Sequence, residues 1–219
     1  MSEVLYAIGV GPGDPDLLTL KAVKTLEKVD VIACPAKDNE PGIAYTIALQ
    51  ACPNIASKKT LSLNFPMQKE NLTDAHNSAA EKIIAELRSG KSVAFLTLGD
   101  PGFYSTFSYI SDAVKKSGYN IEIITGIPSF CAAAAKIGLS IAEGDEAVMI
   151  TAGEYKPFGG TLIIMKAGSK LKELKSAIRH GGKTAYLIEN CGMQNEIIYY
   201  GVDMIPDKTG YFSLMIVTA

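Results

Sequence analysis

Histidine and cysteine are scarce in this chain of 219 residues, and this scarcity excludes several kinds of catalytic and metal site. The two histidines, His76 and His180, lie in polar segments. Two such residues are too few to favour a histidine-based triad or a histidine-rich metal centre. The cysteines are widely spaced, and none forms a C-x-x-C motif. We therefore expect mostly buried free thiols, no disulfide framework and no protein-bound metal. The four cysteines are Cys34, Cys52, Cys131 and Cys191.

Excess charge is also lacking, because 21 Lys and Arg residues against 23 Asp and Glu residues give a formal net charge of −2. A basic surface for nucleic acid is therefore not expected. The chain has no apolar run long enough to span a membrane. Its first residues, "MSEVLYAIGV", carry no basic segment and enter a strand-like pattern at once, unlike a secretory signal peptide. We expect a cytoplasmic protein.

Apolar residues are plentiful, at 47% of the chain, and the length allows one large domain or two compact ones. In the first part, short apolar runs alternate with longer segments of helical periodicity. This alternation predicts a mostly parallel sheet with helices on both faces. We expect Pro35 to end the second strand. The predicted strands cover residues 4–10, 30–36, 92–98 and 120–126, and the predicted helices cover 16–29, 42–52, 75–90 and 103–118.

The second part contains more strands and fewer helices, which indicates a mixed sheet that is partly antiparallel. We place the domain boundary near Gly126, so that residues 1–126 form an N-terminal domain and 127–219 a C-terminal domain. The predicted helices cover residues 129–138 and 169–182, and the predicted strands cover 146–153, 160–168, 184–190, 196–202 and 211–219.

The stretch "GVGPGD" at Gly9–Asp14 follows the first strand and admits three interpretations. A dinucleotide site would need G-x-G-x-x-G and an acid at the end of the second strand, but the spacing here is G-x-G-x-G. A phosphate-binding P-loop would need Gly-Lys-Ser/Thr, which is absent. The third interpretation is a ligand-facing loop of another kind, and a purely structural turn would also explain much of the stretch. In either case Asp14 is a suitable N-cap, with Pro15 in the first helical turn.

A second Gly-Asp-Pro occurs at Gly99–Pro101, where the third strand ends. Asp100 could cap the following helix, with Pro101 in its first turn. It could equally face a ligand, because open α/β sheets bind ligands at the carboxyl ends of their strands. Phe103 and Tyr104 add aromatic surface next to it. A third glycine-containing strand end, "TGIPSFCAAAA" at 125–135, repeats the arrangement with Ser129 as a cap or a ligand contact.

Four motifs in this order resemble the tetrapyrrole methyltransferases of cobalamin and sirohaem synthesis, along nearly the whole chain. Within that family, "DVIACPA", "LTLGDPGFYSTFSYI" and "SFCAAAA" are most similar to the enzymes that methylate C20 of precorrin-2 or cobalt-precorrin-2. The four motifs are "VGPGDPDLLTLKA" near the N-terminus, "LGDP" near residue 100, "GIPSFCAAAA" after the next strand, and "AYLIEN" near the C-terminus.

The resemblance implies a class III methyltransferase fold of two α/β domains with a cleft between them, a mostly parallel first sheet and a mixed second one. S-adenosylmethionine would bind at the domain junction. Two positions depart from the family pattern. Thr125-Gly126-Ile127-Pro128 replaces Pro-Gly-Ile-Thr, and Cys191 replaces a glycine. The cofactor contacts implied by the resemblance are Pro12, Leu98, Gly99, Asp100, Phe103, Ser129, Phe130, Met165 and Cys191.

The reaction implied is methyl transfer to an electron-rich carbon of a reduced tetrapyrrole, which depends mainly on proximity and orientation. A base could still be needed to remove a proton from the macrocycle, and Asp100, Tyr104 and Glu189 are the candidates. The alternative methyl acceptors are another corrin carbon, uroporphyrinogen III, and a protein or RNA as in remote relatives. The alternative from another class is a non-catalytic nucleotide-binding module. The resemblance further implies a homodimer that needs no membrane or nucleic acid.

Overall fold

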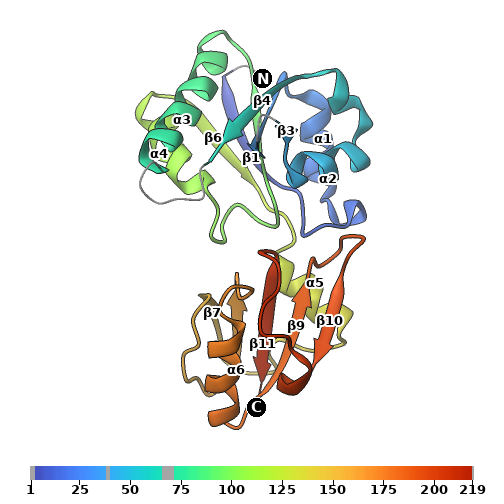
Figure 1. Ribbon diagram of the computed structural model, residues 1–219. Coiled ribbons are helices and arrows are strands. Elements are labelled where there is room, and N and C mark those ends of the chain that lie inside the picture. Colours follow the sequence, from blue (N-terminus) through green and yellow to red (C-terminus); the bar gives the residue numbers. More distant parts are fainter. Residues whose placement is uncertain (1–2, 38–39, 66–71, 219) are drawn as a thin grey trace. The chain divides into compact units, whose positions relative to one another are not determined.

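The computed structural model describes residues 3–37, 40–65 and 72–218, and the chain divides into two compact units, Met1–Pro128 and Ser129–Ala219 (Figure 1). The sequence-based boundary was Gly126. Within the described residues no helix has the length and apolar character to cross a membrane, and no group of His, Cys, Asp and Glu side chains is arranged to hold a metal ion.

The N-terminal unit contains a six-stranded sheet in the order β3-β2-β5-β1-β6, with β4 paired to β2. Every pairing is parallel except that of the two-residue strand β3 with the end of β2. The expected mostly parallel sheet is therefore confirmed. The strands are β1 (Val4–Gly9), β2 (Val31–Lys37), β3 (Glu40–Pro41), β4 (Lys59–Asn64), β5 (Val93–Thr97) and β6 (Asn120–Ile124).

Helices cover both faces of this sheet, as the alternating pattern predicts (Figure 1). On one face, α1 (Leu20–Lys28) and α2 (Ile43–Ala51) pack on the β1 side chain of Ile8. On the other face, α3 (Leu72–Arg88) and α4 (Phe107–Lys116) pack on Phe95 of β5. Both side chains are fully buried. The central strands read as continuous apolar runs because each of their faces is covered by helices.

Three local predictions in this unit were wrong. The first helix does not begin near Asp16: Asp14 caps a short 3-10 helix, η1 (Pro15–Leu17), and Thr19 caps α1 by accepting the Ala22 N–H at 3.2 Å. Pro35 does not end β2, which continues to Lys37. It lies beyond Ala33, the last β2 residue paired with β5, where its missing N–H removes no hydrogen bond to that central neighbour.

The third wrong prediction concerns α4, which begins at Phe107 and not near residue 103. The sequence reading also missed β3 and β4. It missed β4 because Lys59–Asn64 alternates polar and apolar residues at an edge position and lacks the apolar run of the central strands. A 3-10 helix, η2 (Pro53–Ser57), leads into β4.

The C-terminal unit contains a five-stranded mixed sheet in the order β10-β9-β11-β8-β7. Only β7 and β8 pair in parallel, and the other neighbours are antiparallel, which confirms the expected mixed sheet. Leu174 and Ile178 of α6 pack against a buried cluster that includes Met215 of β11. The elements are α5 (Ser129–Lys136), β7 (Val148–Ala152), β8 (Thr161–Met165), α6 (Leu171–His180), β9 (Thr184–Glu189), β10 (Ile197–Tyr200), η4 (Val202–Met204) and β11 (Ser213–Thr218).

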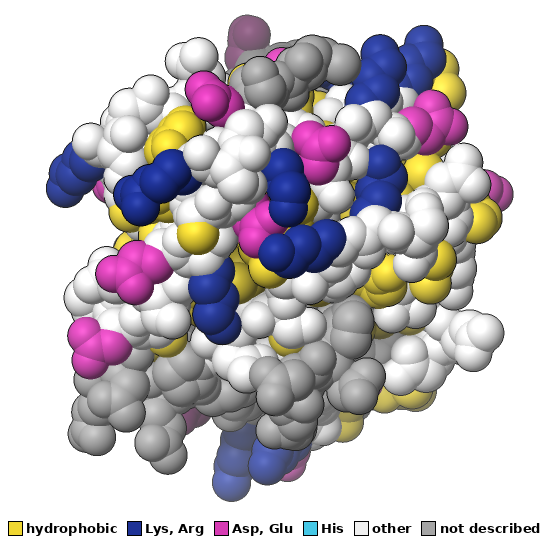
Figure 2. Space-filling model, turned by 90° about the horizontal axis from the view of Figure 1, so that it is seen from above, with side chains coloured by type: hydrophobic (Ala, Val, Ile, Leu, Met, Phe, Trp, Pro, Cys, Tyr) yellow, Lys and Arg dark blue, Asp and Glu magenta, His cyan; other side chains and the backbone are white. Residues whose placement is uncertain are grey.

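Charged side chains of both signs are interspersed over the face seen in Figure 2, with no broad region of one sign. One charged side chain with little exposure is Glu86 at the end of α3, which is 9% exposed. It accepts hydrogen bonds from the Lys59 ammonium and, at 3.0 Å, from the Lys91 ammonium. These two bonds lower the pKa of the Glu86 carboxyl below its ordinary value.

We expect the Glu86→Gln variant to lose about 1 kcal/mol of unfolding free energy near neutral pH, because both lysines are about half exposed and solvent screens the ion pairs. A carboxyl whose pKa is lowered in the folded state stabilises fully above its unfolded pKa. The difference from wild type should therefore disappear as the pH falls below the ordinary value of 4.5 and through the lower folded value.

Urea unfolding at neutral pH and at a pH below that ordinary value measures this prediction. Glu81→Gln, an exposed position on the same helix, is the matched control and should change stability little at either pH. A Glu86→Gln effect of equal size at both pH values would show that the charge of Glu86 is not what stabilises the fold.

Candidate functional site

Three strands of the N-terminal unit end side by side at the carboxyl edge of its sheet. The register places Ile8 of β1 level with Leu96 of β5 on one side and with Ile124 of β6 on the other. Ligands bind to open α/β sheets at this edge, so the loops that follow these strands form the candidate site. Each loop contributes a glycine at or just after its strand end, namely Gly9, Gly99 and Gly126.

The backbones of these three glycines are in contact. A Cβ built on Gly9 would lie 2.5 Å from the Gly126 nitrogen and 2.6 Å from the Gly99 carbonyl oxygen. A Cβ built on Gly126 would lie 2.7 Å from the Gly9 carbonyl carbon. Gly11 and Gly99 also exchange backbone hydrogen bonds of 2.7 and 3.2 Å, and each has a positive φ. Only glycine fits such close approach, so the three loops form one assembly of packed backbone.

Asp100 connects two of these loops through its carboxylate. The side chain is 6% exposed. One oxygen, Oδ1, accepts the Gly102 N–H at 2.7 Å within its own loop, and the other, Oδ2, accepts the Gly126 N–H at 2.9 Å from the loop after β6. Asp100 therefore does not cap α4, and the capping interpretation was wrong. A buried carboxylate held by two backbone donors fixes the relative position of both loops.

The N-cap of α4 is Thr106, which makes no side-chain cap hydrogen bond, and the preceding Ser105 hydroxyl accepts the Phe107 N–H at 3.0 Å. The Ser105 hydroxyl also lies 3.4 Å from that of Thr97, the last residue of β5. Because α4 begins only at Phe107, the residues between Gly99 and Ser105 form a loop of turns and bends. The loop presents Phe103, 39% exposed, and Tyr104, 49% exposed. Tyr104 has a φ of 48°, an uncommon value for a side-chain-bearing residue and one that recurs at functional sites.

In the C-terminal unit, β8 and β9 both run antiparallel to β11, so they end at the same edge of their sheet. Met165 is the last residue of β8, and Cys191 lies in the turn that follows β9. Cys191 is buried, and burial raises the pKa of its thiol to about 11. The thiol is therefore neutral at physiological pH and behaves as a small apolar group.

Carboxylates again hold the turns at this edge. Glu189 accepts the Gly210 N–H at 2.8 Å, which ties the end of β9 to the turn before β11. Glu196 accepts the Gly192 N–H at 2.6 Å and pairs with Lys136 of α5 at 3.1 Å. The turn that contains Cys191 is thus linked to the helix that carries Ser129 and Phe130. A Glu189 oxygen is engaged with a backbone donor, which favours a structural role for this candidate base.

Comparison with known proteins identifies the family. A family model described as Tetrapyrrole (Corrin/Porphyrin) Methylases matches residues 4–202, most of the chain. The chain belongs to the tetrapyrrole methylases. This methylase is 35% identical to a protein of Methanocaldococcus jannaschii named "Probable cobalt-precorrin-2 C(20)-methyltransferase", over 97% of this chain and 95% of the relative. It is 30% identical to the Precorrin-2 C(20)-methyltransferase of a Sinorhizobium species, over 97% and 94%.

Solved structures agree with the fold of this methylase. The uroporphyrin-III C-methyltransferase of Thermus thermophilus has a TM-score of 0.75 at 20% identity, covering 99% of this chain and 92% of that one. A structure of that enzyme complexed with S-adenosylhomocysteine has a TM-score of 0.71 at 17% identity, covering 98% and 91%. At these identities the similarity establishes the fold alone.

The predicted cofactor contacts of the N-terminal unit lie in two adjoining loops of the methylase. Pro12 is buried in the first loop and Leu98 is half-buried at the end of β5, next to Gly99. The Gly11–Gly99 hydrogen bonds join the two loops. In the C-terminal unit Ser129 begins α5, Phe130 is buried behind it, and Met165 and Cys191 lie at the strand ends described above. Each unit thus places its predicted contacts at strand ends or a helix start.

Sequence reasoning missed most of the contacts that hold these loops together. Glycine recurrence at strand ends pointed to Gly9 and Gly126, but the close contact between their backbones has no local signature. The same holds for Glu196, whose partners lie four residues away and on another element. A glutamate in a turn carries no pattern that distinguishes it from a solvated one.

The residues present fit S-adenosylmethionine, which carries no phosphate, better than a polyphosphate. Phosphate cradles rely on lysine or arginine together with backbone N–H groups. The loops 9–15 and 98–105 carry no lysine or arginine, and they offer the accessible apolar and aromatic side chains of Leu98, Phe103 and Tyr104. Surface of this kind suits the adenine ring of the cofactor.

Replacing Asp100 with asparagine tests the connection between the loops. The amide has one oxygen, so either Gly102 or Gly126 loses its acceptor and faces an NH₂ group. Leaving a buried donor unsatisfied costs about 1–3 kcal/mol, so we expect a loss of unfolding free energy in that range together with weaker S-adenosylhomocysteine binding.

Chemical denaturation and calorimetry measure these two effects. Asp112→Asn removes the same charge from an exposed position of α4 and should leave both quantities unchanged. Wild-type stability and wild-type affinity in Asp100→Asn would exclude the bridging carboxylate as a determinant of the site.

Proposed function

We propose that this methylase transfers a methyl group from S-adenosylmethionine to C20 of precorrin-2 or cobalt-precorrin-2 in the biosynthesis of cobalamin. The observation that carries the proposal is its similarity, along nearly the whole chain, to relatives named for that reaction. The Cobalt-precorrin-2 C(20)-methyltransferase of Salmonella typhimurium adds support, at 26% identity over 99% of this chain and 97% of the relative.

In this proposal the N-terminal loops hold the cofactor. S-adenosylmethionine supplies an electrophilic methyl group on a sulfonium whose positive charge disappears during transfer, so the protein contributes chiefly orientation. Pro12, Leu98 and Gly99 present backbone and apolar contacts, and Phe103 presents an exposed ring. Ser129, Phe130, Met165 and Cys191 are proposed to complete the cofactor contacts from the C-terminal unit, on the basis of the family resemblance.

Asp100 and Tyr104 take different roles in this proposal. Both Asp100 oxygens accept backbone hydrogen bonds and the side chain is buried, so Asp100 acts as a positioning residue that keeps the cofactor loop in place. Tyr104 is exposed at the tip of the same loop, and its backbone conformation fixes the direction of its side chain. Tyr104 is therefore the better candidate to contact the macrocycle and to relay the proton that leaves it, with the hydroxyl accepting that proton as it passes its own to water.

A second acceptor is supported by one comparison. The Uroporphyrinogen-III C-methyltransferase of Bacillus subtilis is 33% identical, but over only 69% of this chain and 56% of that relative. Uroporphyrinogen III is therefore the alternative substrate. A nucleotide-binding module without methyl transfer is the alternative from another class, and the absence of a Gly-Lys-Ser/Thr motif counts against it.

Anaerobic incubation with S-adenosylmethionine and each of three acceptors tests the proposed substrate. We expect precorrin-2 or cobalt-precorrin-2 to gain one methyl group by mass spectrometry, at C20 by NMR, and uroporphyrinogen III to remain unmethylated. Methylation of uroporphyrinogen III alone would favour the alternative substrate, and failure to bind S-adenosylhomocysteine in calorimetry would contradict the methyltransferase assignment.

Tyr104→Phe tests the proposed proton acceptor, since it removes the hydroxyl and keeps the ring. General-base catalysis contributes roughly 10²–10⁴-fold, so we expect kcat to fall within that range while KM and S-adenosylhomocysteine affinity stay close to wild type. Phe103→Tyr, a change of similar size on the same loop, is the control. If Tyr104→Phe has an unchanged kcat and pH profile, the Tyr104 hydroxyl takes no part in proton transfer and the ring is a packing contact only.

We also propose a cytoplasmic homodimer, which rests on the family resemblance alone. Light scattering coupled to size-exclusion chromatography measures the oligomeric state directly.

A further inference from the structure

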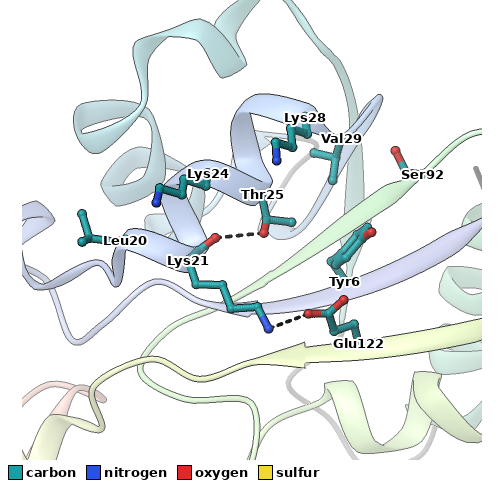
Figure 3. A pocket seen from close by; sticks show the side chains of 9 residues that line it. All are labelled: Tyr6, Leu20, Lys21, Lys24, Thr25, Lys28, Val29, Ser92 and Glu122. Atoms are coloured by element: carbon teal, nitrogen blue, oxygen red, sulfur yellow. Dashed lines mark hydrogen bonds and ion pairs between the residues drawn. The ribbon is translucent and has the colours of Figure 1, made fainter. Parts of the chain in front are cut away.

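A concave site lies in the N-terminal unit, beside the sheet and along helix α1. Its cavity volume is about 510 Å³, within the range of small-molecule sites. The floor consists of the Tyr6 ring, 7% exposed, and Val29, 2% exposed. Glu122 of the edge strand β6 lies opposite α1 (Figure 3). The full lining is Tyr6, Leu20, Lys21, Lys24, Thr25, Lys28, Val29, Ser92 and Glu122.

The charge of this pocket is dominated by three lysines on one face of α1, at positions 21, 24 and 28. Lys21 pairs with Glu122 at 2.6 Å across the pocket (Figure 3). Lys24 and Lys28 form no ion pair with any carboxylate of the described residues. The lining therefore carries two uncompensated positive charges over an apolar floor.

Two hydroxyl groups of the lining, those of Ser92 and Thr25, are already engaged. The Ser92 hydroxyl donates to the Asp30 carboxylate at 2.7 Å, and the Asp30 N–H donates back to the Ser92 oxygen at 3.1 Å. The Thr25 hydroxyl donates to the Lys21 carbonyl at 2.9 Å. Recognition at this pocket therefore falls to the lysine ammonium groups and to the apolar floor.

The arrangement distinguishes between classes of anion. Lys24 and Lys28 are one helical turn apart, about 6 Å along the axis. Compact phosphates are bound by arginine forks, by a lysine set beside a glycine-rich turn, or at open helix starts. The lining has no arginine or glycine, and Thr19 already accepts the Ala22 N–H at the start of α1. Separate ammonium groups above an apolar floor instead match separate carboxylates on an apolar body.

We propose that this pocket, away from the cofactor loops, binds an organic polycarboxylate with an apolar body, whose acid groups pair with Lys24 and Lys28 while its body covers Tyr6 and Val29. A carboxylate-bearing tetrapyrrole belongs to this class, and so does a smaller aromatic polyacid. The inference does not rest on the proposed methyl transfer, because it concerns binding to a different surface.

Lysine acetylation with a water-soluble ester, mapped by peptide mass spectrometry on the full chain, tests the proposal without any methyl transfer. The probes are uroporphyrin I, which carries carboxylates on an apolar macrocycle, 1,3,5-benzenetricarboxylate, citrate, which lacks an apolar body, and ATP. We expect uroporphyrin I or the benzene acid to slow acetylation of Lys24 and Lys28, and of Lys21 in the same lining, several-fold, and added salt to reduce this protection. Lys115 and Lys116, exposed on α4, serve as internal controls.

The two aromatic probes distinguish the sources of the carboxylates, since protection by uroporphyrin I alone indicates a tetrapyrrole and protection by both indicates a general polyacid site. A Lys24→Gln/Lys28→Gln variant should lose the protection of Lys21, whereas Lys115→Gln/Lys116→Gln should retain it. Equal acetylation with and without both aromatic probes, or protection by ATP or citrate as strong as theirs, would overturn the proposal and leave a solvated lysine face.

Discussion

The candidate site of the N-terminal unit depends on one buried carboxylate. Asp100 accepts a backbone N–H from its own loop and another from the loop after β6. Around it, Gly9, Gly99 and Gly126 bring three strand ends into backbone contact. The glycines permit the approach, and the carboxylate fixes it, because two charge-assisted hydrogen bonds in a buried setting resist displacement. The exposed aromatic residues at the loop tip owe their position to this pair of constraints.

The C-terminal unit uses the same physical device with other residues. Glu189 and Glu196 each accept a glycine N–H, from Gly210 and Gly192 respectively. Both bonds hold turns at the edge where β8 and β9 end. In an antiparallel sheet these turns would otherwise be among the most mobile parts of the chain. A carboxylate bonded to a glycine N–H thus occurs at strand-end loops of both units.

Charge in this protein is balanced globally and uneven locally. The formal net charge is close to neutral, and both signs are mixed over the face in Figure 2. Yet α1 places three lysines along one cavity with a single glutamate opposite them. A near-neutral total argues against a nucleic-acid surface, but it does not exclude a local site for a small anion, because the field close to a pocket depends on its lining.

The sequence by itself determined the fold class, the two kinds of sheet, most of the strands and helices, and the family. Apolar runs and helical periodicity are local signals, and family motifs lie on short contiguous stretches. Only the tertiary structure decided the role of Asp100, the start of α4 at Phe107 and the continuation of β2 past Pro35. Each of these three features depends on a partner outside the local sequence or on which strand pairs with which. An N-cap reading of Gly-Asp-Pro is sound locally, but the Gly126 N–H that Asp100 binds lies 26 residues away, where no local pattern can indicate it.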